Sequence, residues 1–245
     1  MSIWIGVGML VAVFCTSMLS GIFGMAGGLI LLWLLFLLLP VGTAIAVHGV
    51  IQIVSNGSRA WFSRQYIDWK ILGIISIGLF VSAGALSLVN YRPDLFVASI
   101  TIGLMPILVW IPTEYLALDA SKPHHAFIAG IVSGTFNIGA GVSGPTVDIF
   151  FIRTMMDRRK IIATKAATQV VSHGIKVLFY WQAAQTLNTG DWTAILIAAP
   201  FAIVGTSAGN WVLQKLSDAN FRKYTRFVVT VIGLFYLGRA LLVLL

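Results

Sequence analysis

The sequence predicts an all-α polytopic membrane protein made of two inverted repeats of about five segments each, with short broken or re-entrant helices near the membrane midplane. Of its 245 residues, 58% are hydrophobic and 10% are charged, and the mean hydropathy is +0.94, which excludes a water-soluble globular domain. A run without charge extends from Ile3 to Leu39. As one helix this run would be about 55 Å long, against roughly 30 Å of hydrocarbon, so the chain must break inside it.

Polar residues, proline and glycine divide the chain into ten apolar segments. We expect them at residues 3–22, 28–39, 44–62, 69–89, 94–113, 125–137, 144–155, 160–182, 191–214 and 220–244. The second, sixth and seventh are too short for a comfortable crossing, which takes about 20 helical residues. They are expected to be half-helices or a re-entrant pair, and either arrangement returns the chain to the side from which it came.

Several stretches of the first half recur in the second half. SGIFGMAGG at 20–28 aligns with SGTFNIGAG at 133–141, and HGVIQIVSNGSRAWF at 48–62 aligns with KAATQVVSHGIKVLF at 165–179. The dipeptide DW and the tripeptide SAG also occur in both halves, at 68–69 and 191–192 and at 82–84 and 207–209.

Five segments per copy is an odd number, so the second copy enters the membrane upside down. Inverted repeats are the usual architecture of secondary transporters. The predicted division is an N-terminal repeat at 1–113, a linker at 114–124 and a C-terminal inverted repeat at 125–245.

The basic residues predict the orientation in the membrane. The formal charge is +8, and the basic residues gather around three connections, Arg59–Lys70, Arg153–Lys160 and Lys215–Arg226. All three fall on one side when every segment is counted, whereas the other side holds only Arg92 and Arg239. By the positive-inside rule we expect a multi-pass protein of the plasma (inner) membrane with both termini outside. The lipid bilayer is the expected partner, and nucleic acid is not.

The two glycine-rich breaks are candidates for a binding site. In hydrocarbon, backbone outside a helix survives only when it is buried in protein or lines a wet cavity. After the second break, Ser143 or Gly144 can be the N-cap and Pro145 the first helical residue, so free N–H groups would face the interior and favour an anion. Close helix packing at these glycines is the alternative. The break residues assigned to the substrate site are Gly24, Gly27, Gly28, Asn137, Gly139 and Gly141.

The segments after the breaks each carry a polar stripe at helical spacing. The candidate substrate-binding side chains are Gln52, Ser55, Asn56, Gln169, Ser172 and His173, and the candidate charge or proton-coupling side chains are His48, Arg59, Lys165, Lys176 and Asp148. A charge near the bilayer centre costs roughly 2.5 to 3.5 kcal/mol on insertion scales, so the stripes should face a cavity. Such a lining suits a small oxyanion, with Gln and Ser as donors and Lys as the charge.

Members of the stripes also have plainer interpretations. Arg59 and Lys176 lie far enough along their helices to reach the membrane interface, and Lys165 is close enough to the basic loop to contact a headgroup. The two glutamines can form interhelical hydrogen bonds. His48 and His173 are either proton carriers, because imidazole titrates near neutral pH, or buried neutral histidines bonded to a neighbour.

Asp148 is the only acidic residue clearly inside a membrane segment, and its counterpart region at Leu31–Leu35 is purely apolar. Two interpretations are open. The side chain is the proton-coupling carboxylate of a secondary transporter, or it is the counter-ion of Lys165 or Lys176.

No enzyme motif is present, because the sequence has no nucleotide-binding loop, no HExxH, no cysteine pair and no serine with an evident base. We therefore expect neither a cofactor nor a metal site. Transport would have to use an ion or substrate gradient, with protons as the candidate coupling ion. A membrane scaffold or assembly factor that transports nothing is the alternative class.

A first helix ending in SGIFGMAGG, a polar third segment followed by IDWK, the second copy SGTFNIGAGVSGP, and the closing DW and SAG together resemble the TauE/SafE family of membrane proteins. The resemblance covers essentially the whole chain. It implies transport of sulfite or an organosulfonate such as sulfoacetate across the plasma membrane, as export coupled to protons. A transporter of the same architecture for another small anion, such as thiosulfate or a carboxylate, or for a cation is the alternative.

Overall fold

A computed structural model describes residues 3–24, 26–112, 115, 118–216 and 218–244, and this part of the chain is helical without a strand. The helices are α1 (Ile3–Phe23), α2 (Ala26–Leu38), α3 (Val41–Phe62), η1 (Arg64–Tyr66), α4 (Trp69–Leu88), α5 (Leu95–Leu104), α6 (Pro106–Trp110), α7 (Pro123–Ala140), α8 (Gly144–Phe151), α9 (Arg158–Phe179), α10 (Trp181–Ala184), α11 (Thr189–Leu213) and α12 (Asp218–Leu244). They follow the predicted segments closely.

Three segments differ from the prediction, and one of them is the seventh, predicted at 144–155, whose helix α8 already ends at Phe151. The fifth is divided into α5 and α6 at Met105, because Pro106 has no backbone N–H to continue the helical hydrogen bonds. The sixth is longer than the predicted 125–137, since α7 continues through Gly139 and has 18 residues, or about 27 Å. α7 therefore crosses most of the hydrocarbon, so of the three segments predicted to be short only α2 and α8 remain so.

Side-chain caps fix the starts of several helices. The carboxylates of Asp68 and Asp94 accept hydrogen bonds from the backbone N–H three residues later, at the starts of α4 and α5. Asn188 and Asp191 form a capping box at the start of α11. The two copies of DW thus both mark helix starts, although Asp68 is an N-cap and Asp191 is the third residue of its helix.

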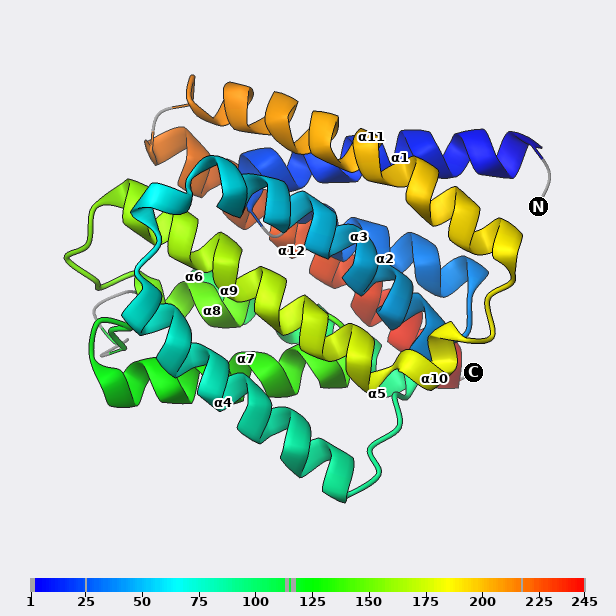
Figure 1. The fold of residues 1–245 in the computed structure, drawn as a ribbon, viewed down its shortest axis with the longest axis horizontal. Helices are drawn as coiled ribbons and strands as arrows, with labels where there is room; N and C mark the ends of the chain where they lie inside the picture. The colour runs from blue at the N-terminus through cyan, green and yellow to red at the C-terminus, as the bar shows by residue number, and fades with distance from the viewer. Residues whose placement is uncertain (1–2, 25, 113–114, 116–117, 217, 245) are drawn as a thin grey trace.

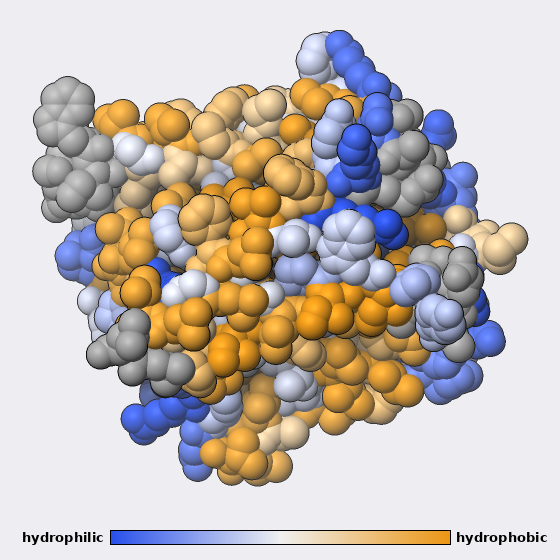
Figure 2. Space-filling model, turned by 180° about the vertical axis from the view of Figure 1, so that it is seen from behind, coloured by the Kyte–Doolittle hydropathy of each residue, from blue (hydrophilic) through white to orange (hydrophobic). Residues whose placement is uncertain are grey.

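The outer surface suits a bilayer. Among the described residues, α1, α4, α11 and α12 are long and apolar enough to cross a membrane. Large hydrophobic side chains such as Phe80, Leu196 and Phe235 are exposed on them. In Figure 2, hydrophobic side chains cover much of the middle of the face, and hydrophilic ones gather mainly toward its ends. The protein is an all-α polytopic membrane protein.

The start of α1 and the end of α12 lie at one end of the molecule (Figure 1). The connections from α3 to α4, from α8 to α9 and from α11 to α12, which carry the basic residues, lie at the opposite end. α2 and α8 each turn the chain back after the helix before it, as the sequence predicts for a short pair. Both termini therefore lie opposite the basic connections, and their placement outside the cell stays a prediction.

The two most closely packed helix pairs each combine a helix of the first copy with a helix of the second. The repeat relates α1 to α7 and α4 to α11, and the structure packs α1 along α11 and α4 along α7. Both contacts are close because glycines face each other, Gly21 with Gly209 and Gly78 with Gly130. α3 and α9, which carry the two polar stripes, pack on one another in the middle. The inverted orientation of the copies and the division into 1–113, 114–124 and 125–245 stay predictions.

Candidate functional site

Both predicted helix breaks are present, and each contains a glycine in the left-handed region. Gly24 follows α1 with φ +76°, and Gly141 follows α7 with φ +86°. Residues other than glycine are strained there, so glycine allows the chain to leave one helix and begin the next. Ser143 occupies the N-cap position of α8 without a side-chain cap bond, and Pro145 is the second helical residue, one later than predicted. The first N–H groups of α2 and α8 thus lie at the breaks.

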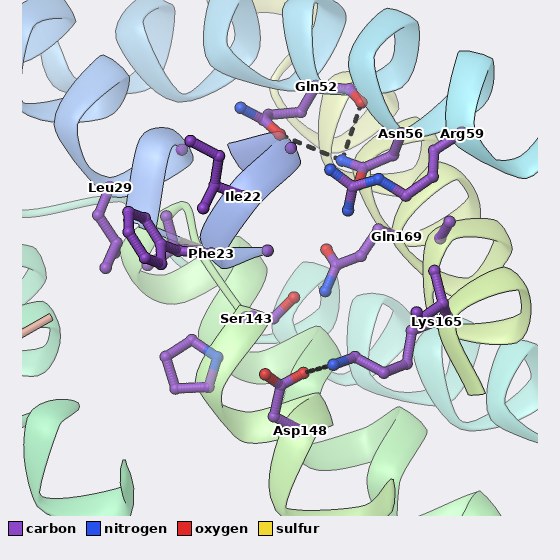
Figure 3. A pocket seen from close by; sticks show the side chains of 18 of the residues that line it. Ile22, Phe23, Leu29, Gln52, Asn56, Arg59, Ser143, Asp148, Lys165 and Gln169 are labelled. Carbon is purple, nitrogen blue, oxygen red and sulfur yellow. Dashed lines mark hydrogen bonds and ion pairs between the residues drawn. The ribbon is translucent and has the colours of Figure 1, made fainter. Parts of the chain in front are cut away.

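One cavity of about 270 Å³ is lined by both breaks, by α3 and α9, and by the ends of α11 and α12. Figure 3 shows side chains from α3, α8 and α9 directed into this space. Its polar lining consists of His48, Gln52, Asn56, Arg59, Ser143, Asp148, Arg158, Lys165, Gln169, His173 and Asn210, together with backbone at Gly24 and Gly28. The structure therefore brings together most of the predicted site residues.

The α3 side of the cavity carries amides and a guanidinium. The Asn56 amide nitrogen Nδ2 donates to the Gln52 side-chain oxygen at 3.1 Å and to the Gln52 backbone carbonyl at 3.0 Å. The Arg59 guanidinium donates to the Ser20 carbonyl in the last turn of α1, at 2.8 Å. Arg59 thus binds a helix C-terminus, where a positive charge is favourable, and lines the cavity.

The opposite side carries an ion pair and an amide. Lys165 of α9 pairs with Asp148 of α8, and both side chains are 29% exposed (Figure 3). Asp148 is thus a counter-ion of Lys165 and not of Lys176, the other partner left open by the sequence. Gln169, one turn after Lys165, projects toward Ser143 in the same view. At this wall a charged pair in partial contact with solvent lies next to polar groups that could bind a ligand.

The inner end of the cavity is formed by buried histidines. The rings of His48 and His173 lie 5.6 Å apart, edge to face, and both side chains are buried. His48 Nδ1 lies 2.8 Å from the Lys176 ammonium nitrogen, which also donates to the Gly141 carbonyl at 2.8 Å. The side chain of Lys176 is 0% exposed, so the alternative in which it reaches the membrane interface is wrong. His48 Nε2, His173 Nδ1 and Ser143 Oγ are buried without a hydrogen-bond partner among the described residues.

Besides Lys176, six predicted site residues lie outside the cavity lining. They pack or bond behind it, and they are Gly27, Ser55, Asn137, Gly139, Gly141 and Ser172. Ser55 bonds to Thr206 of α11 at 2.7 Å, and the Asn137 amide donates to Ser172 Oγ at 2.7 Å. Gly27 packs directly against α1. The carbonyls near the end of α7 accept from side chains, Gly139 from Tyr91 and Gly141 from Lys176.

Other lining residues were not singled out by the sequence. Asn210 directly follows the repeated SAG, so the repeat is the signal that could have located it. Arg158 belongs to the basic connection before α9, and Phe221 lies in the first turns of α12. Neither stands at a repeated position, and only the fold brings them to the cavity.

The charges around the cavity favour an anion. Among the described residues of the lining, Asp148 is the only acid, whereas Arg59, Arg158 and Lys165 are basic. Lys176 adds a fourth basic group directly behind His48. Like-signed groups in a low-dielectric cleft focus the potential and attract ions of the opposite sign.

Comparisons with known proteins agree with this chemistry. The family model described as sulfite exporter TauE/SafE matches residues 9–236. A protein of Cupriavidus necator named probable sulfite/organosulfonate exporter TauE is 25% identical over 207 residues, which cover 80% of this chain and 78% of that protein. No solved structure matches the chain. Since the family model spans nearly all of it, the chain belongs to the sulfite exporter TauE/SafE family.

Proposed function

We propose that this protein is a secondary transporter and not an enzyme, and that it exports a small sulfur-containing anion, sulfite or an organosulfonate such as sulfoacetate, across the plasma membrane. The observation that carries the proposal is that two helix breaks open onto one cavity, and that the described residues of its lining include three basic side chains and one acid. Helix N-termini, amides and cations are the groups that bind oxyanions. The family and the named relative support sulfur oxyanions as the substrate class.

The proposed binding groups come from both halves. Gly24 and Gly28 at the first break, Gln52 and Asn56 on α3, and Gln169 and His173 on α9 lie in the lining. The six predicted residues behind the lining, Gly27, Ser55, Asn137, Gly139, Gly141 and Ser172, hold the breaks and the stripes in place. The residues in the lining are thus proposed to contact the substrate, and the six behind it to maintain the shape of the cavity.

The proposed coupling group is the pair of Asp148 and Lys165. Both side chains are partly exposed, so protons can reach the carboxylate from the cavity. Protonation of Asp148 would release Lys165 to bind the substrate anion. Proton movement would then be linked to substrate binding.

Two lining residues lie at the basic connections, Arg158 at the start of α9 and Leu213 at the end of α11, and Arg158 is exposed, so the cavity reaches the surface at this end. With the positive-inside orientation this end faces the cytoplasm, so the conformation is the one that loads an exported anion. Movement of the two breaks relative to α3 and α9 would expose the site to the other side.

Uptake into proteoliposomes tests the proposal. Sulfite, sulfoacetate, thiosulfate, lactate and a monovalent cation are compared, each with and without a pH gradient. Saturable, gradient-dependent transport of sulfite or sulfoacetate is expected. Saturable transport of the cation without any anion would overturn the proposal, and transport of thiosulfate or lactate alone would replace the substrate class. A scaffold would transport none of the five.

A further inference from the structure

We propose that a specific oxyanion subsite lies at Gly28, where His48 Nε2 and the Gln52 amide donate hydrogen bonds to the anionic headgroup, and that Lys176 and Asn56 are positioning residues that aim these two donors. This subsite rests on the proposed function and deepens it, because it places the sulfonate or sulfite oxygens at one point of the cavity.

The two donors converge on the same space. A Cβ added at Gly28 would lie 3.2 Å from Gln52 Nε2 and 3.4 Å from His48 Nε2. Gly28 is buried and lines the cavity, as do both donors. Any side chain at this position would press on both nitrogens, so glycine is what lets His48 and Gln52 approach the same point of the cavity lining.

Lys176 determines which nitrogen of His48 carries the proton. Its ammonium group has donors only, and it lies 2.8 Å from His48 Nδ1 and 2.8 Å from the Gly141 carbonyl. When Lys176 is an ammonium group, Nδ1 accepts from it, and the proton of the neutral ring is then on Nε2. His48 Nε2 is buried without a partner among the described residues, on a side chain that is 1% exposed. A buried donor without a partner is unfavourable, and an anion oxygen would satisfy it.

Asn56 fixes Gln52 in the same way. The Gln52 backbone carbonyl can only accept, so the Asn56 atom facing it at 3.0 Å must be the amide nitrogen. The Gln52 side-chain atom 3.1 Å from that nitrogen must then be the oxygen. The amide nitrogen of Gln52 is left pointing toward Gly28, as a donor. The two orientations are thus assigned from hydrogen-bond partners.

The subsite favours an anion for a further reason. Lys176 is fully buried, and no described carboxylate lies within ion-pair distance of it. An ammonium group buried without a counter-ion is costly, so a bound anion beside His48 would stabilise the ammonium form of Lys176. A cation at the same place would face two donors and a positive charge.

Binding to the purified protein in lipid nanodiscs tests the subsite, with radiolabelled sulfoacetate as the probe. Gly28→Ala fills the space and should weaken binding by about 10- to 100-fold, the equivalent of one lost hydrogen bond to a charged group. Gly174→Ala is the matched control, because its Cβ would meet nothing within 4 Å, and it should bind as the wild type does. His48→Gln places an amide nitrogen close to the position of Nε2 and should bind more tightly than the shorter His48→Asn.

Nitrogen NMR of protein labelled only at histidine tests the positioning role, and four histidines give few signals to assign. His48 should be protonated at Nε2 in the wild type, and its Nε2 signal should shift when sulfoacetate is added. In Lys176→Met, His48 should no longer be held in one tautomer. The variant should also raise KM much more than it lowers the maximal rate. If Lys176→Met does not fold, the His48 tautomer in the wild-type spectrum and the sulfoacetate affinity of Gly28→Ala still test the subsite.

The outcomes separate this proposal from the proposed function. A wild-type protein that binds sulfoacetate equally well after Gly28→Ala, or a His48 protonated at Nδ1, would overturn the subsite and leave the transporter standing. A wild-type protein that neither binds nor transports any sulfur anion would overturn the proposed function, and the subsite with it.

Discussion

Alanine at Gly27 should force the first helix break apart. Gly27 belongs to α2, and an added Cβ would overlap the Thr16 carbonyl of α1 and lie 2.6 Å from the Ser20 backbone nitrogen. Both atoms belong to the backbone, so no side-chain rotation can relieve the overlap, and α1 must move away from α2. Overpacking costs about 1–3 kcal/mol, and contact with backbone places this change at about 3 kcal/mol or more. The gain in helix propensity is at most about 1 kcal/mol.

Three other glycines provide matched comparisons. Gly24 has φ +76°, and a Cβ added to it would meet nothing within 4 Å. Gly24→Ala should therefore lower the free energy of unfolding only by the left-handed strain, about 1–2 kcal/mol. Gly141→Ala adds contact with the flexible end of Leu32 at 2.7 Å to the same strain, which places it between the two. Gly73→Ala on α4 has neither strain nor contact and should be neutral or stabilising by up to about 1 kcal/mol.

The assay is the midpoint of heat-induced loss of monodisperse protein in one detergent, followed by size-exclusion chromatography. On the scale of soluble domains of this size, about 1 kcal/mol shifts the midpoint by roughly 2–4 °C. After the gain in helix propensity is subtracted, Gly27→Ala should lose at least roughly 4 °C, Gly141→Ala less, and Gly24→Ala least. A Gly27→Ala variant as stable as Gly24→Ala would show that α1 and α2 do not approach closely at the break.

Four further substitutions test the site and the packing around it. Asp148→Asn should remove the dependence of flux on a pH gradient, and unchanged proton-driven flux would make Asp148 a purely structural partner. Gln52→Ala and Gln169→Ala should each lower the rate of anion uptake by about 10-fold or more while the folded yield stays normal; intact transport in both would favour a role for the glutamines in packing. Tyr180→Phe removes the hydroxyl that donates to the Ile138 carbonyl at 2.6 Å, and the buried carbonyl left behind should destabilise the protein by about 1–3 kcal/mol, seen as a lower unfolding midpoint than in the wild type.

Most helix boundaries could be predicted because local chemistry sets them. Gly24 and Gly141 end α1 and α7 since they occupy the left-handed region, and Asp68 begins α4 as its N-cap. The end of α7 was predicted too early because Gly139, unlike Gly141, keeps a helical conformation. A glycine therefore marks a possible break, and the surrounding packing decides which glycine is used.

The depth of each polar side chain could not be predicted from helical spacing. Spacing places Ser55 and Gln52 on one face, yet Ser55 bonds to Thr206 of α11 and Gln52 faces the cavity. Lys176 stands close to the end of α9, which is typical of an interface residue, but its ammonium group turns inward to the Gly141 carbonyl. These outcomes depend on partners more than 30 residues away in the sequence, which periodicity does not contain.

The most direct test is a pair of high-resolution cryo-EM maps of the protein in nanodiscs, one free of sulfur anions and one saturated with sulfoacetate. Both breaks should appear as interrupted helices, and the saturated map alone should contain density beside Gly28 within hydrogen-bonding distance of His48 and Gln52. Continuous helices at the breaks, or a cavity that stays empty under conditions in which sulfoacetate is transported, would contradict the binding of an anion between the two broken helices.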